Sequence, residues 1–250
     1  MVNPYTPPGA KLEKHSLNTD GQGSLQGAIR GEYDFSISEI IAEGWEKTSG
    51  AKGTLLLALL IYSVIAVVVN LALTRVFPDP NVLLKQGQYG MGFFWSTING
   101  LIGIPFTYPL LAGITLLGIR RSVNAKITAG SVFQAYAKTI PLALLGITLM
   151  ALTILGYVLF IIPGIYLSVA YLMSTSLIID RNMGVWEALE TSRKAITKHW
   201  FKIFFLYLLL GLMFALAMLP LLIGLIWMLP LMLIVHGTLY KRMFGVESVH

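Results

Sequence analysis

The sequence predicts an all-α fold: a polytopic membrane helix bundle of six transmembrane helices, arranged as three hairpins, with short amphipathic interfacial helices. Two observations carry this prediction. Of the 250 residues, 56% are hydrophobic and only 12% are charged, whereas a soluble domain carries about 25% charged residues. The apolar residues also gather in long uncharged runs, and six spans of about 20 residues would use about 120 positions. This composition excludes a soluble enzyme, a disordered chain and, because cysteine is absent, a disulfide-linked secreted domain.

Two regions of different composition follow one another along the chain. Residues 1–33 are rich in proline, glycine and polar residues and lack an apolar period, so they are predicted to form a disordered cytoplasmic tail. Pro4, Pro7 and Pro8 favour the polyproline II conformation, which the recognition groove of a protein partner can bind. The alternative is a plain solvated tail. Residues 34–250 form the predicted six-span membrane domain.

An amphipathic helix is predicted at residues 36–47. Ile37, Ile40, Ile41 and Trp45 fall at helical spacing, and glutamates occupy the other face. This segment is too short and too charged to cross a bilayer, so it is expected to lie at the cytoplasmic interface. Short segments at 131–138 and 185–198 precede the third and fifth spans, which suggests three modules, each a surface helix followed by a hairpin.

The boundaries of the spans follow from length. The first two are placed at 54–74 and 93–119. The uncharged stretch 139–179 would reach about 62 Å as one helix, twice a hydrocarbon core of about 30 Å, so it is divided at Pro163 and Gly164. The same argument divides 203–240 at Pro220 into spans of 203–219 and 221–240.

The distribution of lysine and arginine predicts the orientation. One set of loops carries nearly all the basic residues, whereas the opposite set carries Arg75 and Lys85. By the positive-inside rule both termini are expected in the cytoplasm, and the first 50 residues lack the apolar segment of a signal peptide. The predicted location is a bacterial inner membrane.

Contacts with anionic lipid headgroups are expected from basic and tryptophan side chains next to the spans. Because the basic residues lie in short loops between apolar runs, the net charge of +6 does not indicate nucleic-acid binding. The predicted headgroup contacts are Arg120, Arg121, Lys126, Arg193, Lys194, Lys198, Trp45, Trp186 and Trp200.

Polar residues inside the spans are candidate functional groups. His236 is the one histidine placed inside a span, and it is either a hydrogen-bond donor to a neighbouring helix or a titrating switch. Asn70 and Asn99 either join helices or line a polar cavity together. Small residues at Gly100, Gly103, Gly211 and Ala215 are expected where helix backbones approach closely.

No catalytic signature is present. The sequence contains no G-x-S-x-G, H-E-x-x-H or P-loop motif and no carboxylate inside a predicted span. Glu190 precedes Lys194 by four residues, the spacing of a helix-surface ion pair. We therefore expect no enzyme activity, no cofactor and no metal.

The run from Gly156 to Phe205, GYVLFIIPGIYLSVAYLMSTSLIIDRNMGVWEALETSRKAITKHWFKIFF, resembles the YciC-like family of uncharacterised bacterial membrane proteins. It is also similar to the membrane domain of some glycerophosphodiester phosphodiesterases. The shared elements are the Pro163-Gly164 turn, Asp180 at the end of span four, and a surface helix with Ala188, Leu189 and Ser192. The resemblance implies six spans in an inner membrane and no activity, because the phosphodiesterases carry their metal ligands on a soluble domain that this chain lacks.

Three functions remain open at this point. The first is a non-enzymatic scaffold or adaptor that binds lipids and partner proteins at the cytoplasmic face. The second is a small transporter or flippase for a lipid-like or hydrophobic solute, because Pro105, Pro109, Pro163 and Pro230 can break helices around a midplane cavity. The third, a lipid-modifying enzyme, is the least favoured. The sequence does not predict the oligomeric state.

Overall fold

The computed structural model describes residues 22–247, and these residues contain helices and turns with no β-strand. The predicted tail falls mostly on residues 1–21, which lie outside the described residues. The all-helical prediction is confirmed.

The sequence predicted that residues 22–33 belong to a disordered tail, whereas the structure describes an ordered segment there. This segment contains α1 (Leu25–Arg30), whose first turn is capped by the Ser24 hydroxyl accepting from the Gly27 amide. Gly31 ends the helix in the left-handed conformation, with φ of 81°. The buried Tyr33 side chain donates to the Ala195 carbonyl at 3.0 Å. A capped turn and a buried tyrosine therefore fold this segment onto the membrane domain.

Within residues 22–247, five helical segments are long and apolar enough to cross a membrane. The first two are α3 (Lys52–Val76) and α5 (Tyr89–Ser122), joined by α4 (Pro80–Lys85). The third combines the 3-10 helix η1 (Ala129–Lys138) with α6 (Thr139–Leu159), and the fourth combines α7 (Ile161–Ala170) with α8 (Ser174–Arg181). The fifth is α10 (Trp200–Met218). The chain is thus a multi-pass helical membrane protein.

The expected sixth span, α11 (Leu225–Phe244), is not among these five. Its last turn carries Lys241 and Arg242, and most of its residues are buried by other helices. It packs against α5, α10 and α2 (Ile37–Thr48), which makes it the central helix of the described fold. The arrangement of six spans in three hairpins stays a prediction.

The chain reverses between α6 and α7 at Phe160, three residues before the predicted Pro163-Gly164 turn. Phe160 has extended backbone angles, with φ −162° and ψ 146°. Pro163 lies in the first turn of α7, where its missing N–H is tolerated. A Cβ on Gly164 would lie 2.6 Å from the Tyr157 ring, so this glycine permits the close contact of α7 with α6 rather than the turn.

The reversal at Pro220 is a turn formed by residues 219–224, between α10 and α11. Leu221 and Leu222 have positive φ angles of 48° and 68° there. Pro105 and Pro109 lie inside α5, which continues through both.

The three short segments expected before hairpins are helical. They are α2, η1 and α9 (Val185–Lys198). In α2 the Ile40 side chain is buried, whereas Trp45 is exposed.

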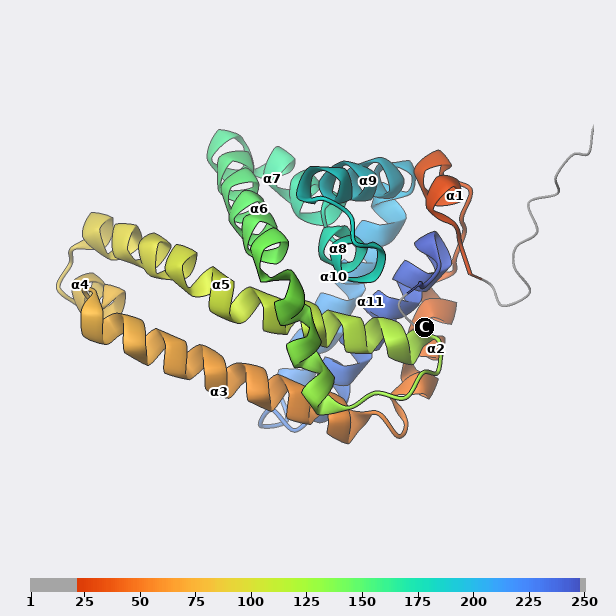
Figure 1. Cartoon of the computed structure of the whole chain (residues 1–250), viewed down its shortest axis with the longest axis horizontal. Coiled ribbons are helices and arrows are strands. Elements are labelled where there is room, and N and C mark those ends of the chain that lie inside the picture. The colour runs from red at the N-terminus through yellow and green to blue at the C-terminus, as the bar shows by residue number, and fades with distance from the viewer. Residues whose placement is uncertain (1–21, 248–250) are drawn as a thin grey trace, which may run out of the picture.

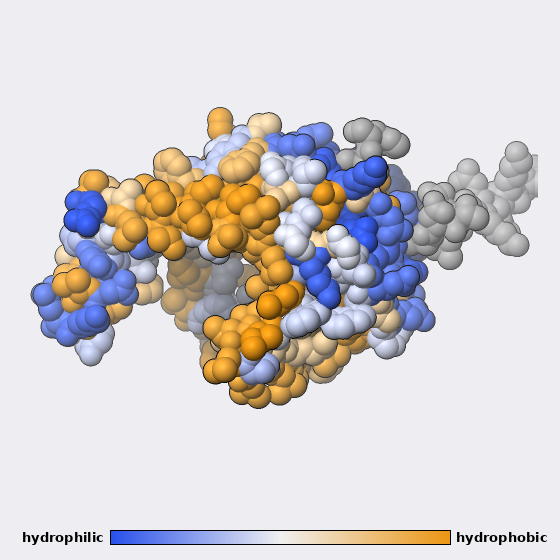
Figure 2. All heavy atoms as spheres, turned by 90° about the horizontal axis from the view of Figure 1, so that it is seen from below, coloured by the Kyte–Doolittle hydropathy of each residue, from blue (hydrophilic) through white to orange (hydrophobic). Residues whose placement is uncertain are grey.

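The overall arrangement is a helical body from which one arm projects. Figure 1 shows α3 and α5 side by side along this arm, which ends at α4, with α1 and α2 at the opposite end. Figure 2 shows hydrophobic residues along the arm and hydrophilic residues at its α4 tip and on the far end of the body. Exposed apolar side chains of α3 produce this surface: Leu57, Leu60, Val64, Val67, Val68 and Leu71.

Candidate functional site

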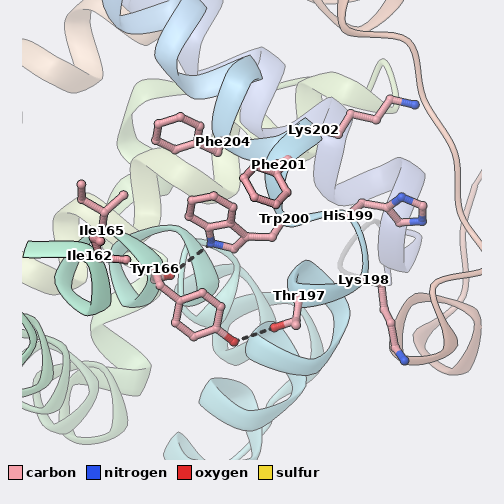
Figure 3. A pocket seen from close by; sticks show the side chains of 10 residues that line it. All are labelled: Ile162, Ile165, Tyr166, Thr197, Lys198, His199, Trp200, Phe201, Lys202 and Phe204. Carbon is pink, nitrogen blue, oxygen red and sulfur yellow. Dashed lines mark hydrogen bonds between the residues drawn. The ribbon is translucent and has the colours of Figure 1, made fainter.

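A cavity of about 790 Å³ lies between α7 and the junction of α9 with α10 (Figure 3). We call it the aromatic groove. Its lining is apolar on the α7 side and contains aromatic and basic side chains on the α10 side. The lining residues are Ile162, Ile165, Tyr166, Thr197, Lys198, His199, Trp200, Phe201, Lys202 and Phe204.

The local sequence explains why aromatic side chains gather here. Helix α9 ends at Lys198, His199 adopts a non-helical conformation, and α10 starts at once with Trp200. Trp200 and Phe204 are four residues apart and share a helix face; their rings stack with centroids 5.1 Å apart and planes 9° apart.

Tyr166 connects this aromatic cluster to α7. Its ring stacks on Trp200 with centroids 6.2 Å apart, and its backbone carbonyl accepts from Trp200 Nε1 at 3.3 Å. Its hydroxyl forms a 2.8 Å hydrogen bond with the Thr197 hydroxyl. Because the polar atoms of Tyr166, Thr197 and Trp200 bond one another, the surface they present to the groove is mainly hydrocarbon.

The basic side chains lie at one edge of the groove. In Figure 3 the ammonium groups of Lys198 and Lys202 point away from Trp200. Lys202 bonds the Asp34 carboxylate at 2.5 Å and lies 4.9 Å from the Phe35 ring centre. This hydrogen bond from Lys202 lowers the pKa of Asp34.

The segment after α1 covers the same edge. His199 Nε2 forms a 3.1 Å hydrogen bond with the Gly31 carbonyl oxygen, which requires the ring to donate from this nitrogen. The Tyr33 ring lies edge-on to His199, with centroids 4.8 Å apart. Lys198 is exposed and packs its aliphatic chain beside Gly31. The edge of the groove is therefore fixed by residues that the sequence had placed in a tail.

The residues predicted to contact lipid headgroups lie in several different parts of the structure. Lys198 and Trp200 meet at the aromatic groove. Trp45 on α2 and Trp186 on α9 are exposed, and Lys126 lies exposed between α5 and η1.

The predicted arginines are engaged with protein groups. Arg120 donates to Gln134 at 2.9 Å, and Arg121 donates to the carbonyls of Lys47 and Ser49. Arg193 makes a two-point contact with Glu190 at 2.7 and 2.9 Å. Lys194 Nζ lies 3.4 Å from the same carboxylate, at the predicted spacing. Binding of lipid headgroups by these residues stays a prediction.

The three predicted intramembrane polar residues occupy two sites. His236 lies in the middle of α11, where its Nδ1 is 2.6 Å from the Tyr207 hydroxyl and its Nε2 is 2.9 Å from the Ser176 hydroxyl. It therefore joins α8, α10 and α11. Asn70 and Asn99 line one cavity between α3, α4 and α5.

An ionic cluster between α2 and α11 was not predicted from the sequence. Glu43 accepts from Lys47 at 2.8 Å, from Lys241 at 2.5 Å and from Arg242 at 3.1 Å. Burial raises the pKa of Glu43, but the hydrogen bonds from the three cations outweigh burial and lower it to about 2. Only the Glu43–Lys47 spacing was visible in the sequence, because the other two partners lie nearly 200 residues away.

A second missed contact fixes the ends of α8 and α11. The Tyr240 hydroxyl donates to Asp180 at 2.8 Å, and both side chains are buried. Arg181 bonds Glu247 and the Phe244 carbonyl oxygen. The sequence placed Asp180 at the end of a span without giving its partner.

Neither a curated protein nor a solved structure matches the chain. A protein family of unknown function, DUF975, matches residues 27–246. This match does not confirm the resemblance to YciC-like proteins or to phosphodiesterase membrane domains. It covers nearly all the described residues, most of α1 included, and on this ground the chain belongs to the DUF975 family.

Proposed function

We propose that the protein is a non-enzymatic scaffold of a bacterial inner membrane, with both termini in the cytoplasm. It holds an anionic phospholipid in the aromatic groove and presents α1, α2 and α9 to a protein partner. The single observation that supports this best is the groove itself: a large, mainly hydrocarbon cavity with lysines along one edge, beside a helix that is able to cross a membrane.

The chemistry of the groove suits the two parts of a phospholipid. Ile162 and Phe201 are 80% and 72% exposed, which is costly in water and favourable against acyl chains. Tryptophan and tyrosine concentrate at the level of the headgroups, where one end of the ring is apolar and the other is wet. Trp200 and Tyr166 have this character, and the exposed Lys198 supplies a cation for the phosphate.

Several features favour binding over chemistry. The polar side-chain atoms of Tyr166, Thr197 and Trp200 bond within the groove, and that of His199 bonds the Gly31 carbonyl oxygen. Within residues 22–247, no cluster of three histidine, aspartate or glutamate side chains is arranged to hold a metal ion. The proposed partner contacts would involve the exposed Trp45 and Trp186. Docking through the proline-rich tail stays a prediction, because residues 1–21 lie outside the described residues.

The test measures phospholipid retained by the full chain purified from nanodiscs that contain phosphatidylglycerol or phosphatidylcholine. Lys198→Gln is expected to weaken phosphatidylglycerol binding about fivefold and to leave phosphatidylcholine unchanged, since one lysine near an anionic lipid contributes about 1 kcal/mol. Trp200→Ala is expected to weaken the binding of both lipids, because it removes the ring that stacks on Tyr166 and Phe204 and lines the groove.

Lys85→Gln is the matched control, since Lys85 is an exposed lysine at the end of α4 that does not line the groove. Equal lipid retention by the wild type and Trp200→Ala would show that the groove does not hold lipid, and the proposal would be abandoned.

A further inference from the structure

A second cavity lies in the arm, between α3, α4 and α5, away from the aromatic groove. Its volume is about 310 Å³, at the small end of the range of about 300–1,000 Å³ for small-molecule sites. Carboxamide side chains from all three helices line it: Asn70 from α3, Asn81 from α4 and Asn99 from α5. We call it the asparagine cavity.

Asn99 is the residue that needs an explanation. It is 7% exposed, and neither its carbonyl oxygen nor its amide nitrogen has a hydrogen-bond partner among the described residues. Nearly all buried polar groups in proteins are hydrogen-bonded, and a carboxamide in an apolar arm has little water to replace the missing bonds. Asn99 lines the asparagine cavity, so an unpaired donor and an unpaired acceptor, both closed to solvent in this conformation, lie beside it.

The other lining residues indicate that a ligand of this cavity is uncharged. None of the residues that line the asparagine cavity is ionisable. Thr107 donates its hydroxyl proton to the Gly103 carbonyl at 3.1 Å, so its oxygen can only accept another bond. Asn70, Asn81 and Ser96 are exposed and sit at the rim. Such a lining offers no counter-charge to an ion and several neutral donors and acceptors.

We propose that the asparagine cavity binds an uncharged vicinal diol, with Asn99 as its central ligand. Each hydroxyl group both donates and accepts, so two adjacent hydroxyls satisfy the nitrogen and the oxygen of Asn99 at once. Such a diol occurs in free polyols and in the glycerol headgroup of phosphatidylglycerol. The site is independent of the aromatic groove, with which it shares no lining residue.

The experiment uses a single reporter thiol. The chain has no cysteine, so Ser96→Cys places one thiol at the rim of the asparagine cavity, and its alkylation by a maleimide is timed. Free glycerol and free glucose are added to the full chain in detergent. A separate arm uses phosphatidylcholine nanodiscs with and without phosphatidylglycerol. An occupied cavity is expected to slow alkylation in a saturable way, by about tenfold.

Two further variants make the result specific. Adding Asn99→Leu should abolish the protection, because leucine fills the same space without polar atoms. Adding Thr97→Val should preserve it, because Thr97 is on the same helix but bonds the Phe93 carbonyl and does not line the cavity. Protection by free polyols assigns a soluble ligand, and protection by phosphatidylglycerol alone assigns a lipid headgroup. If no probe protects the thiol, or if the Asn99→Leu background is protected equally, the proposal is wrong.

Thermal unfolding gives an independent readout without the reporter. Asn99→Leu is expected to raise the melting temperature of the ligand-free chain, because it removes two unpaired polar atoms. A lower melting temperature would show that Asn99 is satisfied within the protein and would overturn the proposal. Gly103→Ala is a second variant. A Cβ at Gly103 meets Leu73 and Val69 at an ordinary 3.9 Å, so the added methyl group is accommodated and should weaken protection by narrowing the cavity.

Discussion

Glu43 is the carboxylate on which three cations converge, and it ties α2 to the end of the central helix. Lys241 is buried, with 7% of its surface exposed, so its charge depends on Glu43 for compensation. Lys47 also donates to the Ser122 carbonyl oxygen, which connects the cluster to the end of α5. A single residue thus holds together one end of three helices.

Glu43→Gln is expected to destabilise the folded chain by about 3 kcal/mol near neutral pH, because it leaves buried cations without a counter-charge. The pKa of Glu43 is lowered from 4.5 to about 2, so its stabilisation is complete above pH 4.5 and is lost as the pH falls towards 2. Thermal unfolding of the wild type and the variant in detergent, compared across this pH range, should show the two melting temperatures converging at low pH.

Glu190→Gln provides the control for this prediction. The hydrogen bond from Arg193, with a further one from Lys194, outweighs the opposing effect of burial and lowers the pKa of Glu190 to about 2 as well. Its ion pairs are screened by water, so the loss of stability should be much smaller. Equal effects of the two substitutions would mean that the Glu43 cluster is not buried as described.

At the scale of helices, the crossing of α5 and α11 depends on two glycines. A Cβ on Gly237 would lie 2.3 Å from the Gly118 carbonyl oxygen, and a Cβ on Gly118 would lie 2.3 Å from the Leu233 carbonyl oxygen. The two backbones are in contact, so neither position has room for a methyl group. Close backbone contact of this kind is a common way for membrane helices to associate.

Gly237→Ala is therefore expected to push α5 and α11 apart and to cost about 1–3 kcal/mol, the usual range for overpacking. Gly211→Ala is the matched control, since a Cβ there meets nothing within 4 Å and alanine favours a helix over glycine. The melting temperature should fall for the first variant and stay level or rise for the second. A Gly237→Ala protein as stable as Gly211→Ala would contradict this crossing.

The sequence was informative about helices and much less so about their contacts. It placed α3, α5 and α10 within a few residues, because apolar run length alone sets those limits. It chose Gly100, Gly103 and Gly211 for close packing, whereas a Cβ added at any of these three glycines would meet no neighbour within 3.4 Å. Small residues are frequent in spans, and the choice among them depends on which helices cross, a property of the whole fold.

The candidate sites show the same limit. Trp200, Lys198, Asn70 and Asn99 were singled out because tryptophan, lysine and asparagine are informative next to or within apolar runs. Their cavities were not predictable, since each cavity needs a third helix packed at a particular angle. The role of residues 31–35 at the aromatic groove was also missed, because a polar, glycine-rich stretch without apolar period gives no sign of a capped helix docked on α9.

At the scale of the molecule, the length of α5 makes the orientation testable. Its 34 residues extend about 51 Å, more than a hydrocarbon core of about 30 Å. Lys85 lies exposed just before this helix, and Lys126 lies exposed just after it. If α5 crosses the membrane, these two lysines lie on opposite sides of it.

The positive-inside rule predicts that Lys126 lies on the cytoplasmic side and Lys85 on the opposite side. Because the chain has no cysteine, Lys85→Cys and Lys126→Cys each provide a single reactive thiol. A membrane-impermeant maleimide applied to intact cells with a permeable outer layer should label Lys85→Cys at once and Lys126→Cys only after lysis. Lys194→Cys, on the exposed face of α9, should behave like Lys126→Cys.

Labelling in the reverse order would retain the fold and invert the orientation, which would place the aromatic groove and its lysines on the outer side. Equal labelling of Lys85→Cys and Lys126→Cys in intact cells would show that α5 does not cross the membrane, and the membrane arrangement proposed for the whole chain would be wrong.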